Sequence, residues 1–159
     1  MHHRAKDTIE IREVDPRDAD AISCLTAYYT ELAERLSQGF EVELSRDPDA
    51  ADLIRPRGAF WVAGPVGAPV GCVGLKGHGG ESAEIKRLWI ARDARRSGLA
   101  LRLMTQAEDV ARELGIRTLQ LDTNSALPEA SAFYRKHGWQ EIDRFNDDPY
   151  AEQFFEKRL

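Results

Sequence analysis

Residues 84–115, EIKRLWIARDARRSGLALRLMTQAEDVARELG, join a strand-like run, a turn that contains a glycine and a strongly periodic helix. The strand-like run covers residues 84–90, and the turn RRSGLA covers residues 95–100. Apolar residues then recur at spacings of three and four, which predicts a helix with one apolar face. They are Leu99, Leu103, Ala107, Val110 and Leu114. Gly115 is expected to end this helix.

The turn between this strand and this helix has the chemistry of an anion site. The first turn of a helix carries unpaired backbone N–H groups and the positive end of the helix dipole. Gly98 would let a phosphate approach this backbone, because glycine has no Cβ. Arg95 and Arg96 add two positive charges. From these residues alone, an ordinary turn with two solvated arginines remains an alternative interpretation.

Two motifs resemble those of the GNAT superfamily of N-acetyltransferases. Arg95-x-x-Gly98-x-Ala100 resembles the family's pyrophosphate-binding pattern Q/R-x-x-G-x-G/A. Residues 128–139, PEASAFYRKHGW, resemble its A-x-x-F-Y-x-x-x-G-F/W segment. The motifs stand in the family's order, and the resemblance covers about residues 58–159. Arg92 stands where many members have proline, and Ala100 where many have glycine.

The order of expected elements indicates a single α/β domain, residues 1–159, in which helices flank a mixed, mostly antiparallel sheet. This order matches the fold that the GNAT resemblance implies. The expected strands are residues 8–14, 59–63, 70–76, 83–90, 118–123, 139–145 and 152–157. The strands at 83–90 and 118–123 are expected to run parallel, joined by the long helix, and to splay at one end.

Three further helices are expected. Asp15-Pro16 is a helix-start signal, with an N-cap side chain followed by proline. The apolar face of the helix that follows is expected to be Ile22, Leu25, Tyr29, Leu32 and Leu36. A short helix is expected at residues 47–54, and another at residues 128–137.

Composition excludes several classes of protein. A net charge of −5 and a pI near 5.4 argue against a broad nucleic-acid-binding surface. No apolar run is long enough to cross a membrane, and the charged start MHHRAKDT is unlike a signal peptide, so a cytoplasmic protein is expected. Cys24 and Cys72 are interpreted as buried or incidental free thiols. No residue grouping has metal-ligand spacing, so no metal is expected.

The resemblance implies two catalytic residues for amide formation from a thioester. Glu84 occupies a position like that of the general base in several GNAT enzymes, where it would act directly or through a water. The alternative is a solvated acid paired with Lys86 or Arg87. Tyr134 lies where the family's thiolate-protonating tyrosine is found; the alternative is a tyrosine that only packs in the core.

The resemblance also implies that the cosubstrate is acetyl-CoA. Backbone groups of Leu88, Trp89 and Ile90 would run beside the pantetheine arm. Asn124 is a candidate for binding pantetheine or the acetyl group, and Arg135 for the nucleotide end; each could instead be structural or solvated. The expected pyrophosphate-binding residues are Arg95, Arg96, Ser97, Gly98, Leu99 and Ala100.

The expected acceptor is a small, cationic primary amine that attacks the thioester directly, because the chain is acidic and has aromatic residues that could hold a cation. The candidate acceptor-binding residues are Tyr28, Tyr29, Asp147, Asp148 and Tyr150, and Phe40 is a further candidate wall. A module that binds acyl-CoA or another phosphate ligand without transfer is the alternative function. A homodimer is left open.

Overall fold

The computed structural model describes residues 9–36, 50–124 and 128–159. Within them, a seven-stranded sheet has the order β1-β2-β3-β4-β5-β7-β6. The strands are β1 Ile11–Glu13, β2 Ala59–Ala63, β3 Gly71–Gly77, β4 Ser82–Ile90, β5 Thr118–Thr123, β6 Gln140–Ile142 and β7 Gln153–Arg158. The α-helices are α2 Ala19–Arg35, α4 Leu99–Glu113 and α5 Pro128–Lys136, and the short 3₁₀ helices are η1 Ala50–Leu53 and η2 Arg92–Ala94.

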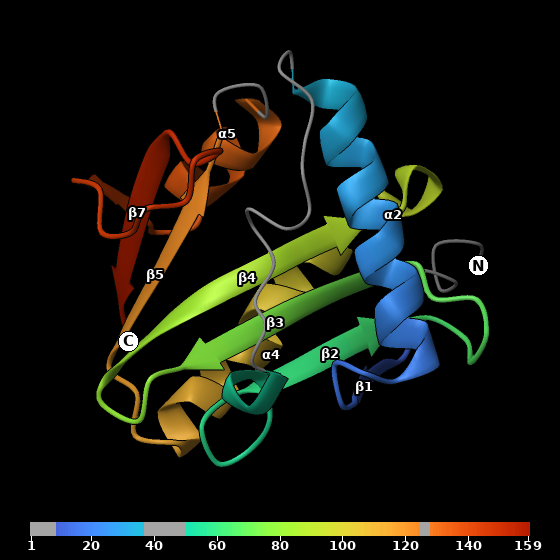
Figure 1. Ribbon diagram of the computed structural model, residues 1–159, viewed down its shortest axis with the longest axis horizontal. Helices are drawn as coiled ribbons and strands as arrows, with labels where there is room; N and C mark the ends of the chain where they lie inside the picture. The colour runs from blue at the N-terminus through green and yellow to red at the C-terminus, as the bar shows by residue number, and fades with distance from the viewer. Residues whose placement is uncertain (1–8, 37–49, 125–127) are drawn as a thin grey trace.

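The parallel pair β4–β5 is joined through α4, and the other neighbouring strands of the described sheet pair antiparallel. β4 and β5 pair only from Ser82↔Thr118 to Glu84↔Gln120. Beyond that point the two strands diverge, so the sheet opens into a V (Figure 1). The sequence-based prediction of one mixed domain with splayed parallel strands is therefore confirmed.

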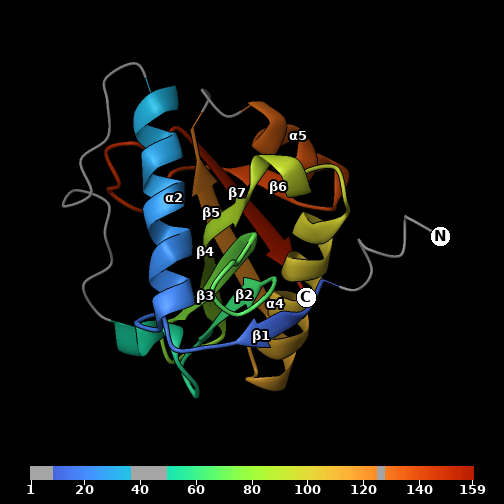
Figure 2. The same ribbon diagram turned by 90° about the vertical axis from the view of Figure 1, so that its right-hand side faces the viewer.

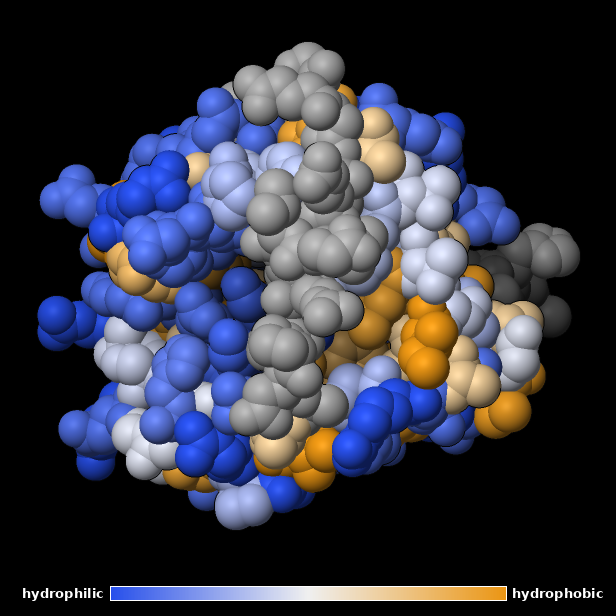
Figure 3. All heavy atoms as spheres, in the orientation of Figure 1, coloured by the Kyte–Doolittle hydropathy of each residue, from blue (hydrophilic) through white to orange (hydrophobic). Residues whose placement is uncertain are grey.

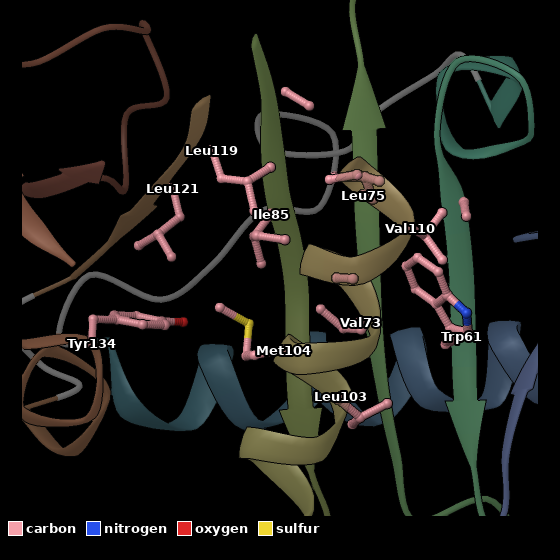
Figure 4. Close-up of a cluster of buried hydrophobic side chains, with 14 of the residues drawn as sticks. Trp61, Val73, Leu75, Ile85, Leu103, Met104, Val110, Leu119, Leu121 and Tyr134 are labelled. Atoms are coloured by element: carbon pink, nitrogen blue, oxygen red, sulfur yellow. The ribbon is translucent and has the colours of Figure 1, made fainter. Parts of the chain in front are cut away.

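Helices cover both faces of the sheet: α2 lies on one side and α4 on the other (Figure 2). The larger apolar cluster lies against α4 and includes Trp61, Val73, Leu103 and Val110 (Figure 4). A smaller cluster under α2 includes Phe60. Because successive strand residues face opposite sides and both sides are covered, all five residues of β2 are buried.

The beginning of α2 differs from the prediction. The N-cap is Asp18, whose carboxylate accepts a hydrogen bond from the Asp20 N–H, and not Asp15. The Asp15 carboxylate instead accepts from the backbone and the guanidinium of Arg17. Residues 15–18 form a separate turn, closed by the Asp18 N–H donating to the Asp15 carbonyl at 2.9 Å.

The predicted apolar face of α2 is also partly wrong. Ile22 is 52% exposed, whereas Ala21 and Cys24 are buried against the sheet with Leu32. The small side chains of Ala21 and Cys24 let the helix approach the strands, which turns Ile22 outward. Figure 3 shows hydrophobic residues over α2 and beside the grey segment, and hydrophilic residues over most of the rest of that face.

Three other predicted elements are shorter in the structure. β1 and β6 each have three residues, because each pairs with its neighbour over three positions only. The helix predicted at residues 47–54 is the short η1, and residues 47–49 lie outside the described residues. Among the described residues, no helix combines the length and apolarity needed to cross a bilayer.

Candidate active site

A β-bulge in β4 shapes the open side of the V. The register with β3 pairs Cys72 with Trp89 and Gly74 with Lys86, so Arg87 and Leu88 both stand opposite one residue of β3. Arg87 has φ 58°, a left-handed conformation that is uncommon for residues other than glycine. The extra residue changes the alternation of β4, so its second half presents side chains differently from its first half.

The divergence of β4 and β5 leaves a cavity of about 120 Å³ between them. Its walls come from α2, β4, β5, α5 and the loop before β7. They comprise Tyr28, Tyr29, Leu32, Leu36, Ile85, Lys86, Arg87, Leu88, Leu121, Asp122, Thr123, Asn124, Ala130, Tyr134, Asp148, Tyr150 and Ala151. The cavity thus combines aromatic walls with charges of both signs.

Seven of the candidates from sequence line this cavity: Tyr28, Tyr29, Leu88, Asn124, Tyr134, Asp148 and Tyr150. Glu84, Asp147 and Arg135 do not line it, nor do the residues of the glycine turn. Sequence reasoning missed the three charged side chains on its strands, Lys86, Arg87 and Asp122. The signal available in the sequence was the alternation of side chains along a strand. Glu84 and Gln120 form the last pair before β4 and β5 separate. Lys86 and Asp122 each lie two residues further along their strands.

Tyr134 reaches the cavity from α5 and is 6% exposed. Its ring packs edge-on against Trp139, and the centroids of the Tyr134 and Phe155 rings lie 5.7 Å apart. Figure 4 shows its hydroxyl end directed toward β4 and Met104. Burial, together with the charge of Asp122, raises the pKa of Tyr134 above its usual value. The phenol therefore remains protonated at neutral pH and can donate a proton or a hydrogen bond.

Asp122 and Lys86 face each other across the splay. Lys86 Nζ lies 3.9 Å from Asp122 Oδ2, which also accepts a 2.7 Å hydrogen bond from Asn146 Nδ2. Burial raises the pKa of the Asp122 carboxyl despite these two partners, and the charges of Asp148 and Glu84 add to the increase. A carboxylate with a raised pKa is a stronger proton acceptor than an exposed one.

Glu84 lies just before the splay, at the last paired position of β4. Glu84 is 7% exposed, so it is buried rather than solvated. Its Oε2 lies 3.6 Å from Nε2 of His78. Its carboxylate does not border the cavity. Its charge nevertheless reaches the site, because it contributes to the raised pKa of Asp122.

The glycine turn has the form of an anion cradle. Gly98 has φ +84°, and a Cβ built there would have nothing within 4 Å. The first intrahelical bond of α4 runs from the Arg102 N–H to the Gly98 carbonyl, so the amides of residues 99–101 precede it. These N–H groups and this open backbone fit a pyrophosphate.

Several side chains of the glycine turn contact the rest of the protein instead of facing the proposed anion site. The Arg95 guanidinium donates to the Ile90 carbonyl at 2.9 Å and to Glu31 of α2 at 2.5 Å, so it fastens the turn to α2. Arg96 is exposed, with φ 64°. Ser97 Oγ donates to the Ala94 carbonyl, and the Leu99 side chain is buried in the core.

The other candidates have partners within the protein. Asn124 Nδ2 donates to the Tyr150 carbonyl at 2.7 Å, and Arg135 donates to Glu141 at 2.6 Å. Asp148 Oδ1 accepts the backbone N–H of Tyr150, whereas Asp147 is exposed and outside the cavity. Trp89 packs under α2, Ile90 belongs to the core against α4, and Phe40 lies outside the described residues.

A profile of the Acetyltransferase (GNAT) family matches residues 25–139, which include the bulged strand, the glycine turn and α5. The chain belongs to the GNAT family. It is an acetyl-CoA-dependent N-acetyltransferase.

Three bacterial proteins are similar to this GNAT chain over most of their length. The uncharacterized N-acetyltransferase YjgM of Escherichia coli (strain K12) is 31% identical over 136 residues, 81% of this chain and 78% of that protein. An IAA acetyltransferase of Azospirillum brasilense is 33% identical over 135 residues, 81% of this chain and 86% of that protein. An aminoalkylphosphonate N-acetyltransferase of Salmonella typhimurium is 26% identical over 137 residues, 83% of this chain and 85% of that protein.

Solved structures share the GNAT fold. An acetyltransferase of the GNAT family from Staphylococcus aureus superposes with a TM-score of 0.81 at 19% identity, over 96% of this chain and 99% of that chain. A GNAT acetyltransferase from Elizabethkingia anophelis, solved with acetyl-CoA bound, has a TM-score of 0.64 at 15% identity, over 96% and 99% of the two chains. At these identities the likeness concerns the fold alone.

The cysteines of this GNAT protein are free and buried, as the sequence indicated. Cys24 is 1% exposed and Cys72 is 0% exposed. Cys72 Sγ lies 3.2 Å from the Arg87 carbonyl, and burial raises the pKa of the Cys72 thiol. Neither cysteine lines the cavity. Among residues 9–36, 50–124 and 128–159, no group of three or more His, Cys, Asp or Glu residues is arranged to hold a metal.

Proposed function

We propose that the protein transfers acetyl from acetyl-CoA directly to the primary amine of a small molecule. The observation that carries the proposal is the position of the cavity, which opens where β4 leaves β5, on the strand that leads to the glycine turn. A thioester lying along β4 would meet an amine held in this cavity. The similarity to an aminoalkylphosphonate N-acetyltransferase supports a small amine as the acceptor.

The pyrophosphate of acetyl-CoA would bind the amides of residues 99–101, with Gly98 allowing close approach. Arg96 would add charge, while Arg95 would act by fastening the turn to α2. Beyond Glu84, β4 has no ladder with β5, so backbone groups of Leu88, Trp89 and Ile90 are candidates for binding the pantetheine arm. Asn124 and Arg135 remain lesser candidates, because each already contacts the protein.

For the chemical step, the neutral amine nitrogen would attack the thioester carbon, and the carbon–sulfur bond would break as the amide forms. Asp122 would accept the proton that the ammonium must lose, because its carboxylate borders the cavity and has a raised pKa. Glu84 would assist indirectly, because its negative charge raises the pKa of Asp122. Tyr134 would protonate the departing thiolate, and the second proton that the nitrogen loses as the amide forms would return to the Tyr134 phenolate.

A thiol-release assay with acetyl-CoA across amino acids, polyamines, aminoglycosides and peptides tests this function. Turnover that depends on the amine supports it. A thermal-shift comparison of acetyl-CoA with ATP and NAD provides the control. Stabilisation by acetyl-CoA without turnover of any amine would contradict catalysis and favour a coenzyme-binding module. The homodimer stays a prediction, which light scattering can test.

The acceptor pocket would be formed by Tyr28, Tyr29, Asp148 and Tyr150. The aromatic rings and Asp148 would suit the cationic amine expected from the sequence. Lys86 and Arg87 on the same walls alter this balance, since two cations now oppose two carboxylates. A purely cationic acceptor such as a polyamine is therefore less favoured than an amine that also carries negative charge.

A further inference from the structure

The charged groups that line the cavity differ in how far they are already neutralised. Asp122 is near Lys86 and accepts a hydrogen bond from Asn146, and Asp148 accepts the Tyr150 N–H. Arg87 is half-buried, and within residues 9–36, 50–124 and 128–159 no carboxylate or carbonyl pairs with its guanidinium. The cavity thus has an unmatched positive charge at Arg87.

The backbone conformation of Arg87 is a second observation that points to a role in binding. Its φ of 58° is a conformation that glycine or asparagine adopts more readily than arginine. The bulge alone would be served better by either of those residues. An arginine in this conformation, with its side chain on a cavity wall, is the kind of local strain that concentrates at binding sites.

We propose that Arg87 binds an anionic group of the acceptor, a carboxylate or a phosphonate, while the amine of the same molecule faces Asp122. A guanidinium matches both oxyanions, because its N–H groups form paired hydrogen bonds with two oxygens. Lys86 is the neighbour of Arg87 on β4, and its Nζ lies 3.9 Å from Asp122 Oδ2, so it adds positive potential near the anion. The acceptor is then a small zwitterion rather than a polyamine. This inference rests on the proposed transfer to an amine.

Matched acceptors and an Arg87 variant test the subsite. Wild-type kcat/KM is compared for β-alanine, 2-aminoethylphosphonate, the neutral control n-propylamine and the dication putrescine. The Arg87→Asn variant keeps the bulge, because asparagine tolerates a positive φ. It should raise KM for the anionic acceptors by roughly 10- to 100-fold, the usual effect of losing a hydrogen bond to a charged group. KM for acetyl-CoA should not change, and the melting temperature should not fall.

The rate for n-propylamine should be the same in both proteins. A wild-type preference for putrescine or n-propylamine, or an equal loss for all acceptors in Arg87→Asn, would overturn the subsite while leaving acetyl transfer intact. If no amine turns over, the proposed function fails separately. Calorimetry with propionate and ethylphosphonate in the presence of CoA then decides the subsite: binding that Arg87→Asn abolishes supports it, and no binding to wild type refutes it.

Discussion

Lys86 Nζ on β4 lies 3.9 Å from Asp122 Oδ2 on β5, across a gap where the two strands no longer pair. Elsewhere in the sheet backbone hydrogen bonds join neighbouring strands, but here two side chains of opposite charge do so. A partly buried ion pair of this kind contributes little net stability, because desolvation offsets the attraction. Its consequence is electrostatic, since it places a carboxylate with a raised pKa on the cavity wall.

Replacing Asp122 with asparagine should lower kcat by about 10²-fold or more, the range of a general base, without unfolding the protein. The direction in which stability changes with pH follows from the raised pKa of Asp122. The wild type loses stability as pH rises from the unfolded pKa through the raised folded pKa, because the buried carboxyl must ionise. The asparagine variant lacks this loss, so its melting temperature relative to wild type should increase from acid to neutral pH.

Glu84→Gln is the comparison for that experiment. Glu84 lies outside the cavity and acts on Asp122 only through its charge, so kcat should fall less than in Asp122→Asn. The acid limb of the kcat profile should move to lower pH, because one cause of the raised Asp122 pKa is removed. Full activity in Asp122→Asn combined with its loss in Glu84→Gln would assign the base to Glu84.

Tyr134→Phe should lower kcat by about 10²-fold, the lower range for an acid catalyst, with little change in KM for acetyl-CoA. Phenylalanine keeps the ring contacts with Trp139 and Phe155, so the melting temperature should stay near that of wild type. Steady-state kinetics and a thermal melt on the same preparation check both points. A variant that folds and retains full turnover would assign Tyr134 to the core alone.

The fold could be predicted from the sequence where local pattern and tertiary packing agree. The periodic residues of α4 form its buried face, with Leu99, Leu103 and Ala107 at most 1% exposed. The start of α2 could not be predicted in this way. The Asp15 carboxylate accepts a hydrogen bond from Arg17, and Asp18 is the N-cap instead. That competition depends on side-chain geometry, which a helix-start signal does not contain.

The site was predictable in its framework but not in its charges. Tyr134 and Gly98 follow from motifs, whereas Arg87 and Asp122 depend on a bulge and on the point at which β4 and β5 separate. One extra residue in a strand changes which side chains share a face, so alternation alone cannot place Arg87. Likewise, the contact of Arg95 with Glu31 joins residues far apart in sequence, which no local pattern shows.

Gly98→Trp should weaken acetyl-CoA binding by roughly tenfold or more, equivalent to at least about 1.4 kcal/mol, because the side chain would fill the pyrophosphate approach. Gly67→Trp is a matched control. Both glycines have φ +84° and open space at the Cβ position, so both variants bear the same left-handed strain. Calorimetry should show weaker binding for Gly98→Trp only. Equal affinities in the two folded variants would refute the anion cradle.

Asp20→Asn should destabilise the protein at neutral pH and much less in acid. Arg12 and the Gly67 N–H donate to the Asp20 carboxylate, and these hydrogen bonds lower its pKa. A lowered folded pKa gives stability that is present above the unfolded pKa and lost as pH falls through the folded pKa. Melting temperatures of wild type and variant should therefore converge only at pH values below the usual aspartate pKa of about 3.9.

Asp15→Asn is the control for Asp20. The pKa of Asp15 is lowered to about 2, first by the hydrogen bond from Arg17, but this contact joins residues two apart in an exposed turn. Asp20 instead ties α2 to β1 and to the turn between β2 and β3. Asp15→Asn should change the melting temperature less at every pH. If both variants behave alike, the Asp20 network is not what holds these elements together.

Direct attack predicts that no acetyl group passes through a cysteine. Cys24 and Cys72 are at most 1% exposed and outside the cavity, so neither thiol can reach a thioester bound there. Burial also raises the pKa of Cys72, which makes its reactive thiolate scarce. Intact-protein mass spectrometry, quenched during turnover with acetyl-CoA alone and with an amine, should find no acetylated enzyme. Cys24→Ala and Cys72→Ala should keep kcat wherever they remain folded, and a thioester on either cysteine that forms and decays as fast as turnover would refute direct transfer.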